Sequence, residues 1–413
     1  MGAPKMVAAD VPDRGRLFYL VDDALEFVPE VKEFLDWKAA TRRAPATLKG
    51  YCYRLSWYYR FLDQQGLGVR EVAPADLTEF VLWLCNPRRA GAVASVDQPN
   101  PLGAKSINLI LQTVAALYRF LVRRGIVAES PVRFVDVPRG RWLTERDLLA
   151  HTRTGARARS VQRMELKLKE PKRLPKTVSA RDFGVFVDRI QVARRPEDDP
   201  AGFRDRLICL VLKESGLRSG ELLGLHVDDL DFGRGGMQVR FRPANENGAR
   251  AKAGYGRDRF VHLAPDILGL LDVYLSEVWV RVPPRTAHLW VVMRKDARTR
   301  DGVATVGTAL TPAALGKMFQ YYSRMSGVTI HPHMLRHTHA TDLVRSYLQA
   351  GQAVDWKYIQ ERLGHASVVT TMEIYTHLGD DDRKEAYDAY LKRRDAARTR
   401  RRGQPSRPDA DEA

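Results

Sequence analysis

Residues 331–341 read HPHMLRHTHAT, and this short stretch holds four of the ten histidines of the chain together with Arg336. Pro332 suits the first turn of a helix, because proline has no N–H to donate and first-turn N–H groups have no partner inside the helix. A helix from this point places His333 and Arg336 on one face, near its N-terminus. Free N–H groups and the helix dipole attract anions there. The stretch therefore predicts a helix that presents a phosphate-binding pair.

A metal site is the other use that these histidines suggest. His333 and His337 are four residues apart, a spacing that suits two zinc ligands on one helical face. Against zinc, Met334 stands where the HExxH motif has glutamate, and Arg336 would set a positive charge beside the metal. No carboxylate falls within the motif and no cysteine lies nearby. We therefore favour phosphate over zinc, and expect no metal and no other cofactor.

A second arginine lies in SGLRSGELLGL, residues 215–225. Arg218 stands between two glycines, where one apolar helix is predicted to end and another to begin. Glu221 follows three residues later and is placed to pair with Arg218. A surface salt bridge is the simpler interpretation, but the surrounding leucines predict that Arg218 is at least partly buried. Since a partly buried arginine usually has an anion beside it, Arg218 strengthens the prediction of an anion site.

A third cation comes from the loop between two predicted strands. Lys252 lies in ARAKAGYGRDR, residues 249–259, in a loop that could reach a groove. A lysine beside a phosphodiester can protonate the oxygen that leaves when the ester is cut. Arg250 and Arg257 are near neighbours, and any of the three could instead only contact phosphate.

Two more residues follow in LGHAS (363–367) and TTMEIYTHL (370–378). Gly364 permits a sharp turn directly before His365. Tyr375 comes ten residues after His365. A tyrosine on an amphipathic helix is normally a core residue, but Tyr375 falls near the end of its predicted helix.

The fold class is mainly α with a small β-sheet, that is, α+β. Over residues 27–135 apolar side chains recur at helical spacing, which predicts a helical bundle. One helix, SINLILQTVAALYRFLVRRG, is predicted to begin with Ser106 as its N-cap and to stop at Gly125. The aromatic side chains of TLKGYCYRLSWYYRFLDQQG could stack on bases, but a core role is the better interpretation.

After residue 175 the pattern changes. Ser179 and Asp182 resemble a capping box that opens a helix. MQVRF and DRFVHLA predict two strands joined by a long loop. Further helices are predicted in FRDRLICLVLKESG, PAALGKMFQYYSRMSG, HMLRHTHATDLVRSYLQAG and WKYIQERLG.

The formal net charge of +17 predicts an anionic partner, and nucleic acid is the usual one. A charge for solubility alone is less plausible because the basic residues cluster, in residues 151–175 and 392–402. No apolar run is long enough for a membrane span, and the N-terminus lacks the pattern of a signal peptide. Cys52, Cys85 and Cys209 read as buried free thiols in a reducing cytoplasm.

Together, GLRSGELLGL, HMLRHTHAT, LGHAS and IYTH resemble the motifs of the tyrosine recombinases, also called the phage integrase family. The catalytic set of that family is Arg, Lys, His-x-x-Arg, His or Trp, and Tyr, in that order. The residues that match it are Arg218, Lys252, His333, Arg336, His365 and Tyr375. The resemblance spans residues 27–395, and the long loop around Lys252 looks like that of transposon-borne integrases.

The resemblance implies a domain organisation and partners. It implies a core-binding, DNA-binding domain over 27–135, a basic linker over 136–175 and a catalytic domain over 176–395. Residues 1–26 stay unassigned, and residues 396–413 read as a disordered tail. The implied partner is double-stranded DNA, bound by a homotetramer on two DNA sites, with accessory DNA-binding proteins as further candidates. A cytoplasmic, nucleoid-associated location follows from such a role.

The resemblance also implies the chemistry. Tyr375 would attack the scissile phosphate and form a 3′-phosphotyrosyl link, which retains the bond energy, so that neither ATP nor metal is needed. The two arginines would bind the extra negative charge of the pentacoordinate state. His333 would hydrogen-bond or deprotonate the nucleophile, His365 would donate to a non-bridging oxygen, and Lys252 would be the general acid.

Three other functions are weighed against recombination. A type IB topoisomerase uses a similar set of residues, but the helical domain ahead of the catalytic one favours a recombinase. The complete catalytic set argues against a non-catalytic DNA-binding regulator. A metallohydrolase would lose its activity on chelation.

Overall fold

The computed structural model describes residues 4–11, 15–41, 43, 45–85, 102–138, 160–171, 176–190, 198–242, 245–249, 258–283, 285–294 and 305–365, with residues 367, 368, 372, 388 and 391. The chain divides into two compact units, Met1–Lys172 and Arg173–Ala413. Each unit has a buried hydrophobic core of its own. The division falls inside the stretch that the sequence predicted to be a linker.

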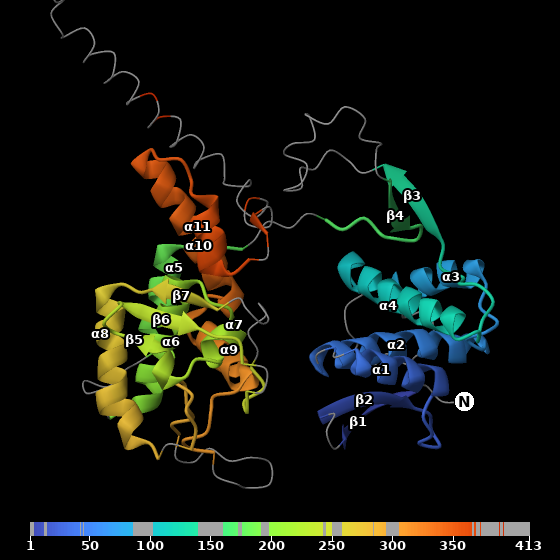
Figure 1. The fold of residues 1–413 in the computed structure, drawn as a ribbon, viewed down its shortest axis with the longest axis horizontal. Coiled ribbons are helices and arrows are strands. Elements are labelled where there is room, and N and C mark those ends of the chain that lie inside the picture. The colour runs from blue at the N-terminus through green and yellow to red at the C-terminus, as the bar shows by residue number, and fades with distance from the viewer. Residues whose placement is uncertain are drawn as a thin grey trace, which may run out of the picture. The chain divides into compact units, whose positions relative to one another are not determined.

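The described part of unit 1 is a helical bundle that carries two antiparallel hairpins (Figure 1). Its helices are α1 (Pro29–Ala40), α2 (Pro45–Gln65), α3 (Pro74–Cys85) and α4 (Ala104–Arg123). Its strands are β1 (Lys5–Val11), which pairs with β2 (Gly15–Val21), and β3 (Phe134–Pro138), which pairs with β4 (Ser160–Met164).

The core of unit 1 forms where α2 packs on α1 and α4. Trp57, Tyr58 and Phe61 are buried in it, which confirms the core role predicted for these aromatic side chains. The hydroxyl groups of Tyr58 and Tyr118 lie 2.6 Å apart, and Tyr118 donates to the carbonyl of Val69 at 2.9 Å. This hydrogen bonding satisfies two phenols that would be costly to bury alone.

Helix α4 differs from its prediction at one end. It begins at Ala104 with Gly103 as N-cap, so the prediction of Ser106 as N-cap is wrong. Ala104 and Lys105 are good helix formers, and the N–H of Ser106 already donates to the carbonyl of Gly103 at 2.8 Å. The other end agrees with the sequence, since Gly125 adopts a left-handed φ of 71° just after the last turn.

Strands β3 and β4 overlap the predicted linker, residues 136–175, because β3 spans its start and β4 lies within it. The two strands pair in register from Phe134 with Met164 to Pro138 with Ser160. Asn108 of α4 holds the continuation of β4, because its side chain accepts from the N–H of Leu168 and donates to the carbonyl of the same residue, both at 2.9 Å. Residues 134–138 and 160–171 are therefore a folded part of unit 1.

The three cysteines differ in exposure. Cys52 and Cys209 are buried free thiols, as the sequence predicted. Cys85 is free but exposed, so the prediction of burial is wrong for it. It is the last residue of α3, and the buried side of that helix is formed by Leu77, Phe80 and Leu84.

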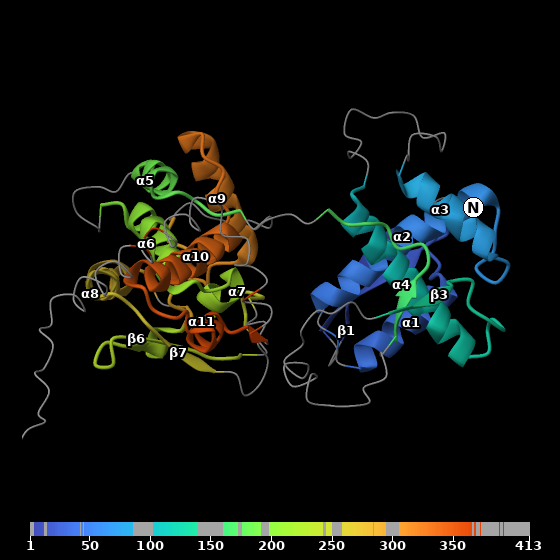
Figure 2. The same ribbon diagram turned by 90° about the horizontal axis from the view of Figure 1, so that it is seen from above.

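Unit 2 places a small sheet among helices (Figures 1 and 2). The sheet is antiparallel in the order β5 (Leu230–Asp231), β6 (Gly236–Val239), β7 (Arg259–His262), and the two longer strands confirm the predicted pair. The helices are α5 (Ala180–Asp188), α6 (Pro200–Ser215), α7 (Ser219–Leu223), α8 (Pro265–Val273), α9 (Pro312–Ser326), α10 (Pro332–Ala350) and α11 (Trp356–Leu363).

Packing in unit 2 brings distant helices together. Helix α10 packs along α6, and α11 contacts both α10 and strand β7. Ser179 caps α5 by accepting from the N–H of Asp182 at 3.0 Å, which is the serine half of the predicted capping box. In the described ranges, no helix is both long and apolar enough to cross a membrane.

Candidate active site

The candidate site is built around Glu221, whose side chain has no exposed surface. Its carboxylate lies 2.8 Å from a guanidinium nitrogen of Arg218, 2.8 Å from one of Arg259 and 3.9 Å from one of Arg336. It also accepts from the backbone N–H of Arg218 at 3.0 Å. Three positive charges thus surround one negative charge, which leaves a net charge of +2.

Local sequence explains how Arg218 and Glu221 meet. Helix α6 ends at Ser215, and its C-cap residue Gly216 turns the chain sharply with a left-handed φ of 64°. Arg218 is then the N-cap residue of α7. Glu221 occupies the third position of α7, so the spacing that the sequence showed brings the two side chains together. The side chain of Arg218 is 21 % exposed, which confirms the prediction of partial burial.

The same arginines hold the end of α11. Three successive carbonyl groups there accept from arginines of other elements. The carbonyl of Arg362 accepts from Arg259 at 2.9 Å, that of Leu363 from Arg336 at 2.7 Å, and that of Gly364 from Arg218 at 3.1 Å. The last carbonyls of a helix have no partner within it and carry partial negative charge. Guanidinium groups therefore suit this end, and they fix the turn that leads into His365.

Two left-handed glycines make this convergence possible. Gly216 has φ 64°, and a Cβ there would lie 2.6 Å from His339 Cδ2. Gly364 also has φ 64°, and a Cβ there would lie 2.7 Å from a guanidinium nitrogen of Arg259. Arg336 donates to the carbonyl of Gly216 at 2.8 Å, so the turn after α6 is tied to α10. A side chain at either glycine would push apart groups of the site.

Helix α10 begins at Pro332, as predicted, and carries the other candidate residues. Arg336 is buried, with a side chain only 3 % exposed, whereas His333 is exposed. The rings of His333 and His337 lie 4.4 Å apart between centroids in an edge-on arrangement. The helix therefore presents a histidine pair near its N-terminal end, with one histidine about a turn before the buried Arg336 and the other directly after it.

Burial, together with the charges of Arg336 and Arg218, lowers the pKa of His365 to about 3. Burial also lowers the pKa of His337 to about 4, together with His333 and Arg336. Burial alone would raise the pKa of Glu221, but Arg259 and Arg218 outweigh it and hold that pKa below its ordinary value. At neutral pH the imidazoles of His337 and His365 are therefore neutral and the Glu221 carboxylate is ionised.

Two arginines in or beside this cluster, Arg259 and Arg362, were not among the residues predicted from the sequence. Arg259 lies two residues before buried Val261 on β7, and strand alternation places both on one face, a signal that could have revealed it. Arg362 donates to His339 Nε2 at 3.0 Å and to the carbonyl of Glu214 at 3.0 Å. No local sequence pattern predicts the contacts of Arg362, because His339 and Glu214 are far from it in the sequence.

Two predicted catalytic residues, Lys252 and Tyr375, lie outside the described residues, as do Arg250 and Arg257. The structure thus brings together Arg218, Arg336 and His365 and sets His333 on the same helix as Arg336. The roles of Lys252 and Tyr375 stay predictions.

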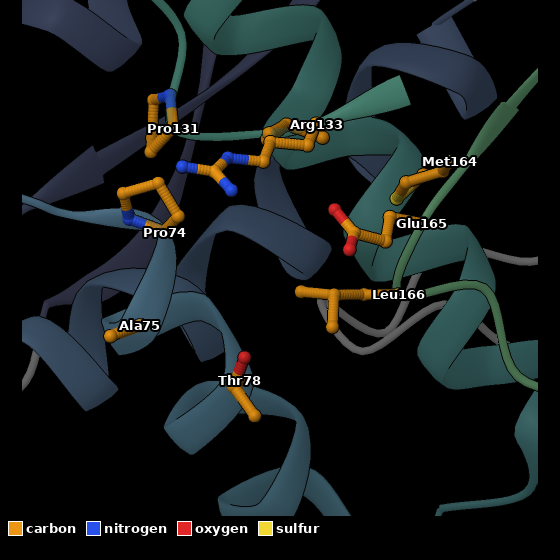
Figure 3. A pocket seen from close by; sticks show the side chains of 9 residues that line it. Pro74, Ala75, Thr78, Pro131, Arg133, Met164, Glu165 and Leu166 are labelled. Atoms are coloured by element: carbon orange, nitrogen blue, oxygen red, sulfur yellow. The ribbon is translucent and has the colours of Figure 1, made fainter. Parts of the chain in front are cut away.

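Among the described residues, no group of three histidine, cysteine or acidic side chains is placed to hold a metal ion. A hollow of about 200 Å³ lies in unit 1, between the start of α3 and the β3–β4 hairpin (Figure 3). Pro74 and Thr78 form one side of it and Glu165 and Leu166 another. It contains none of the predicted catalytic residues.

Comparison with known proteins gives several relatives along most of the chain. Transposase A from transposon Tn554 of Staphylococcus aureus is 27% identical over 380 residues, which cover 92% of this chain and 95% of the relative. Tyrosine recombinase XerA of Pyrococcus furiosus is 30% identical over 220 residues, which cover 53% of this chain and 63% of the relative.

Solved structures share the fold. A XerH site-specific recombinase bound to palindromic difH substrate matches with a TM-score of 0.54 and 18% identity, over 86% of this chain and 82% of that chain. The Tn1549 transposon integrase in complex with a circular intermediate DNA matches with a TM-score of 0.53 and 18% identity, over 88% of this chain and 98% of that chain.

Two family profiles match the chain in the order expected from the motifs. The phage integrase, N-terminal SAM-like domain matches residues 31–125, in unit 1. The phage integrase family matches residues 188–381, which include every predicted catalytic residue. These matches cover most of the chain, and the chain belongs to the phage integrase family of tyrosine recombinases.

Proposed function

We propose that this chain binds double-stranded DNA and recombines it at specific sites through a 3′-phosphotyrosyl intermediate, with the residues assigned below. The observation that carries the assignment is the convergence of Arg218, Arg336 and the turn before His365 around one buried carboxylate. Structures of the XerH recombinase and the Tn1549 integrase contain DNA, and this chain shares their fold.

The charge of the arginine cluster suits the reaction. Arg218, Arg259 and Arg336 carry three positive charges and Glu221 one negative charge, so two positive charges remain. A phosphodiester has one negative charge, and the pentacoordinate state formed when an oxyanion adds to it has two. The cluster therefore complements the transition state better than the bound substrate, which is the condition for catalysis.

Tyr375 is the proposed nucleophile. A tyrosine has an ordinary pKa of about 10, so at pH 7 full ionisation of its hydroxyl costs about 4 kcal/mol. The arginine cluster lowers this cost by stabilising negative charge on the attacking oxygen and on the phosphate. Because the guanidinium groups are already held by Glu221 and by the carbonyls of α11, little reorganisation is needed during the reaction.

The bonds and protons balance without a co-reactant. The Tyr375 oxygen bonds to phosphorus, the bond from phosphorus to the 5′ oxygen breaks, and the DNA 3′ end stays linked to the protein. His333 accepts the phenol proton, and Lys252 gives a proton to the departing 5′ oxygen. A 5′-hydroxyl from another strand reverses these steps and joins the strands. His365, neutral in the free protein, has one N–H and donates it to a non-bridging oxygen.

Assembly and location follow from this role. We infer that four copies act on two DNA sites, because strand exchange breaks and rejoins four strands and each chain supplies one tyrosine. We infer that unit 1 contributes a DNA-binding surface, since a SAM-like domain of this family matches it. The protein is then expected at the nucleoid, where its substrate is.

A type IB topoisomerase activity is the second candidate, because it needs the same residues around one phosphate.

Replacement of the nucleophile tests the assignment. Tyr375→Phe is expected to form no covalent adduct with a nicked suicide substrate on a denaturing gel, because phenylalanine has no oxygen to link to phosphorus. DNA binding in a mobility-shift assay is expected to stay within about threefold of the original protein, since only the hydroxyl is removed. An adduct formed by the variant would overturn the assignment.

The same preparation distinguishes the two activities. A recombinase is expected to exchange strands between two DNA molecules that carry its site and to leave a supercoiled plasmid without the site unchanged. Relaxation of that plasmid by the protein, lost in Tyr375→Phe, would favour the topoisomerase.

A further inference from the structure

The backbone of His365 is held on both sides by one residue, Gln360 of α11. The N–H of His365 donates to the backbone carbonyl of Gln360 at 3.0 Å, and the side-chain amide of Gln360 donates to the carbonyl of His365, also at 3.0 Å. Gln360 is half-buried, and a hydrogen bond that is partly shielded from water is stronger than an exposed one. Two hydrogen bonds thus close the chain from Gln360 to His365 into a ring.

The turn after α11 has the form of a Schellman motif. Gly364 takes the left-handed conformation with φ 64°, and its N–H donates to the carbonyl of Glu361 at 3.0 Å. The bond from the N–H of His365 to the carbonyl of Gln360 completes the motif. The motif itself uses the N–H of His365 but not its carbonyl. The amide of Gln360 binds that carbonyl and so fixes the residue more tightly than the motif alone would.

Gln360 also extends a row of side-chain donors along this turn. The three carbonyls before that of His365 accept from Arg259, Arg336 and Arg218. The carbonyl of His365 comes next, and its donor belongs to α11 itself. The arginines fix where the turn lies relative to other elements, and Gln360 fixes how the backbone leaves the turn. Since the allowed side-chain rotamers depend on the backbone, Gln360 also limits where the His365 ring points.

His365 needs a fixed direction because its ring lies near the arginine cluster. Burial lowers the pKa of its imidazole, and the charges of Arg336 and Arg218 act in the same direction. The neutral ring has one N–H to donate. Such a donor stabilises the transition state only when it is already placed where negative charge develops. A misplacement of about 1 Å can cost about a hundredfold in rate.

We propose that Gln360 is a positioning residue that sets the imidazole N–H of His365 against a non-bridging oxygen of the scissile phosphate. The proposal rests on the proposed function, because it requires that His365 donate to that oxygen. Gln360 acts on the backbone of His365 and makes no contact of its own with the phosphate. Loss of its amide should therefore weaken one contact to the phosphate and spare the contacts that the arginines make.

Sulfur in place of one non-bridging oxygen gives a readout that is specific to this contact. Sulfur is a weak hydrogen-bond acceptor, so a donor that serves the replaced oxygen loses most of its effect. The two phosphorothioate isomers each replace one of the two non-bridging oxygens. Rates of covalent adduct formation are measured for the full-length protein on pre-bound suicide substrates with ordinary phosphate and with each isomer. The original protein is expected to be slowed more by the isomer whose sulfur faces His365.

Gln360→Met and Gln360→Lys are the test variants. Methionine is similar in length to glutamine but has no N–H to donate, whereas lysine keeps a donor. Gln360→Met is expected to form the adduct about tenfold more slowly on ordinary DNA and to lose the extra slowing by that one isomer. Gln360→Lys is expected to react within about threefold of the original protein on all three substrates, because the neighbouring carbonyls already accept from cations.

Three further variants calibrate the readout. His365→Ala is expected to be about 10² to 10³ times slower on ordinary DNA and to lose the same isomer-specific slowing. The double variant Gln360→Met with His365→Ala should be no slower than His365→Ala, because Gln360 acts through that ring. Gln320→Met is the matched control, since Gln320 lies at an exposed position of α9. It should react within about twofold of the original protein on every substrate.

The outcomes separate the two proposals. If the original protein forms no adduct at Tyr375, the proposed function fails. If His365→Ala keeps the isomer-specific slowing, the role of His365 in that function fails, and the role of Gln360 falls with it.

If both of these hold but Gln360→Met reacts at full speed, or is slow while it keeps the isomer-specific slowing, the positioning role alone is overturned. Loss of the folded state in Gln360→Met, seen by circular dichroism, would also overturn it, since Gln360 would then serve the fold and not the histidine.

Discussion

Glu221 is the residue on which the arginine cluster depends. It is a buried carboxylate in contact with Arg218 and Arg259 and near Arg336. Burying an ion pair gains little net stability, but removing one partner of a buried pair leaves the others uncompensated at a large cost. The carboxylate therefore keeps the guanidinium groups together in the absence of DNA and prevents their mutual repulsion from opening the site.

Glu221→Gln is expected to lower the free energy of unfolding by about 3 to 5 kcal/mol, because three arginines lose their shared negative partner. Adduct formation should fall as well, since Arg218 and Arg259 lose their fixed positions. Urea unfolding followed by tryptophan fluorescence measures the stability. Glu361→Gln, on the exposed side of α11 beside Lys357, is the control and should change stability by less than about 1 kcal/mol. Equal effects of the two changes would contradict the role given to Glu221.

His339 gives the site a dependence on pH through stability. Burial lowers its pKa from 6.5 to about 3, and the charge of Arg362 acts in the same direction. Between these values the unfolded chain binds a proton at His339 that the folded chain does not, so stability falls as the pH drops from 6.5 toward 3. The neutral ring is also the acceptor for Arg362 Nε at 3.0 Å.

His339→Gln is expected to remove this dependence while keeping a polar group in place. Between pH 7 and pH 5 the original protein should lose about 2 kcal/mol more stability than the variant. Urea unfolding of both proteins at the two pH values measures the difference. An equal loss of stability in the original protein and the variant would show that His339 does not titrate in this way.

At the scale of elements, the end of α11 is the junction of the site. Arg218 at the N-cap of α7, Arg259 of β7 and Arg336 of α10 donate to the carbonyls at this end. Gly364 lets the chain turn there with φ 64°. A side chain at Gly364 would be strained and would also press on the guanidinium of Arg259, 2.7 Å away. The position therefore tests how far the site depends on this junction.

Gly364→Ala is expected to cost about 2 to 3 kcal/mol of stability and at least tenfold in adduct formation, from backbone strain plus the displaced Arg259. Gly327→Ala is the matched control, because Gly327 ends α9 with φ 72° and has nothing within 4 Å of an added Cβ. Strain alone should cost the control about 1 kcal/mol, with adduct formation unchanged. An activity loss as large in the control would contradict this reading of the junction.

The sequence predicted those features of the site that depend on residues close together in the chain. The turn at Gly216, the pairing of Arg218 with Glu221 and the start of α10 at Pro332 all follow from spacings of a few residues. The link from Arg259 to Arg362 was not predictable in this way, because it joins positions 103 residues apart in the sequence. Such contacts are set by the packing of α11 on β7.

The two hairpins of unit 1 were missed for a different reason. In strand β3 the side chains of residues 134–137 are exposed or half-buried, so they show no buried alternation. The surrounding sequence is basic, which is typical of a linker, and the strand was therefore not predicted. Strand β2 does carry an apolar run, with Leu17, Tyr19 and Leu20 buried. A short pair of strands at a chain end gives too few residues for the periodicity to stand out.

At the scale of the whole molecule, charge governs the encounter with DNA. The chain carries 67 Lys and Arg against 50 Asp and Glu. Inside unit 2, several arginines already form ion pairs with Glu221, Asp205 and Asp229. The excess positive charge that attracts DNA must therefore come largely from other positions. The affinity for DNA and the rate of adduct formation should then respond differently to salt, because salt screens surface charges much more than buried ones.

Binding to duplex DNA is therefore expected to weaken steeply between 50 and 200 mM salt, by about 10³ to 10⁵ if six to ten phosphates are neutralised. The rate of adduct formation on DNA that is already bound should change by less than about threefold over the same range, since the arginine cluster is shielded from ions. Fluorescence anisotropy gives the affinity, and a quench of pre-bound suicide substrate gives the rate. A rate that falls as steeply as the affinity would mean that phosphate recognition in the active site is itself exposed to salt, contrary to the buried cluster around Glu221.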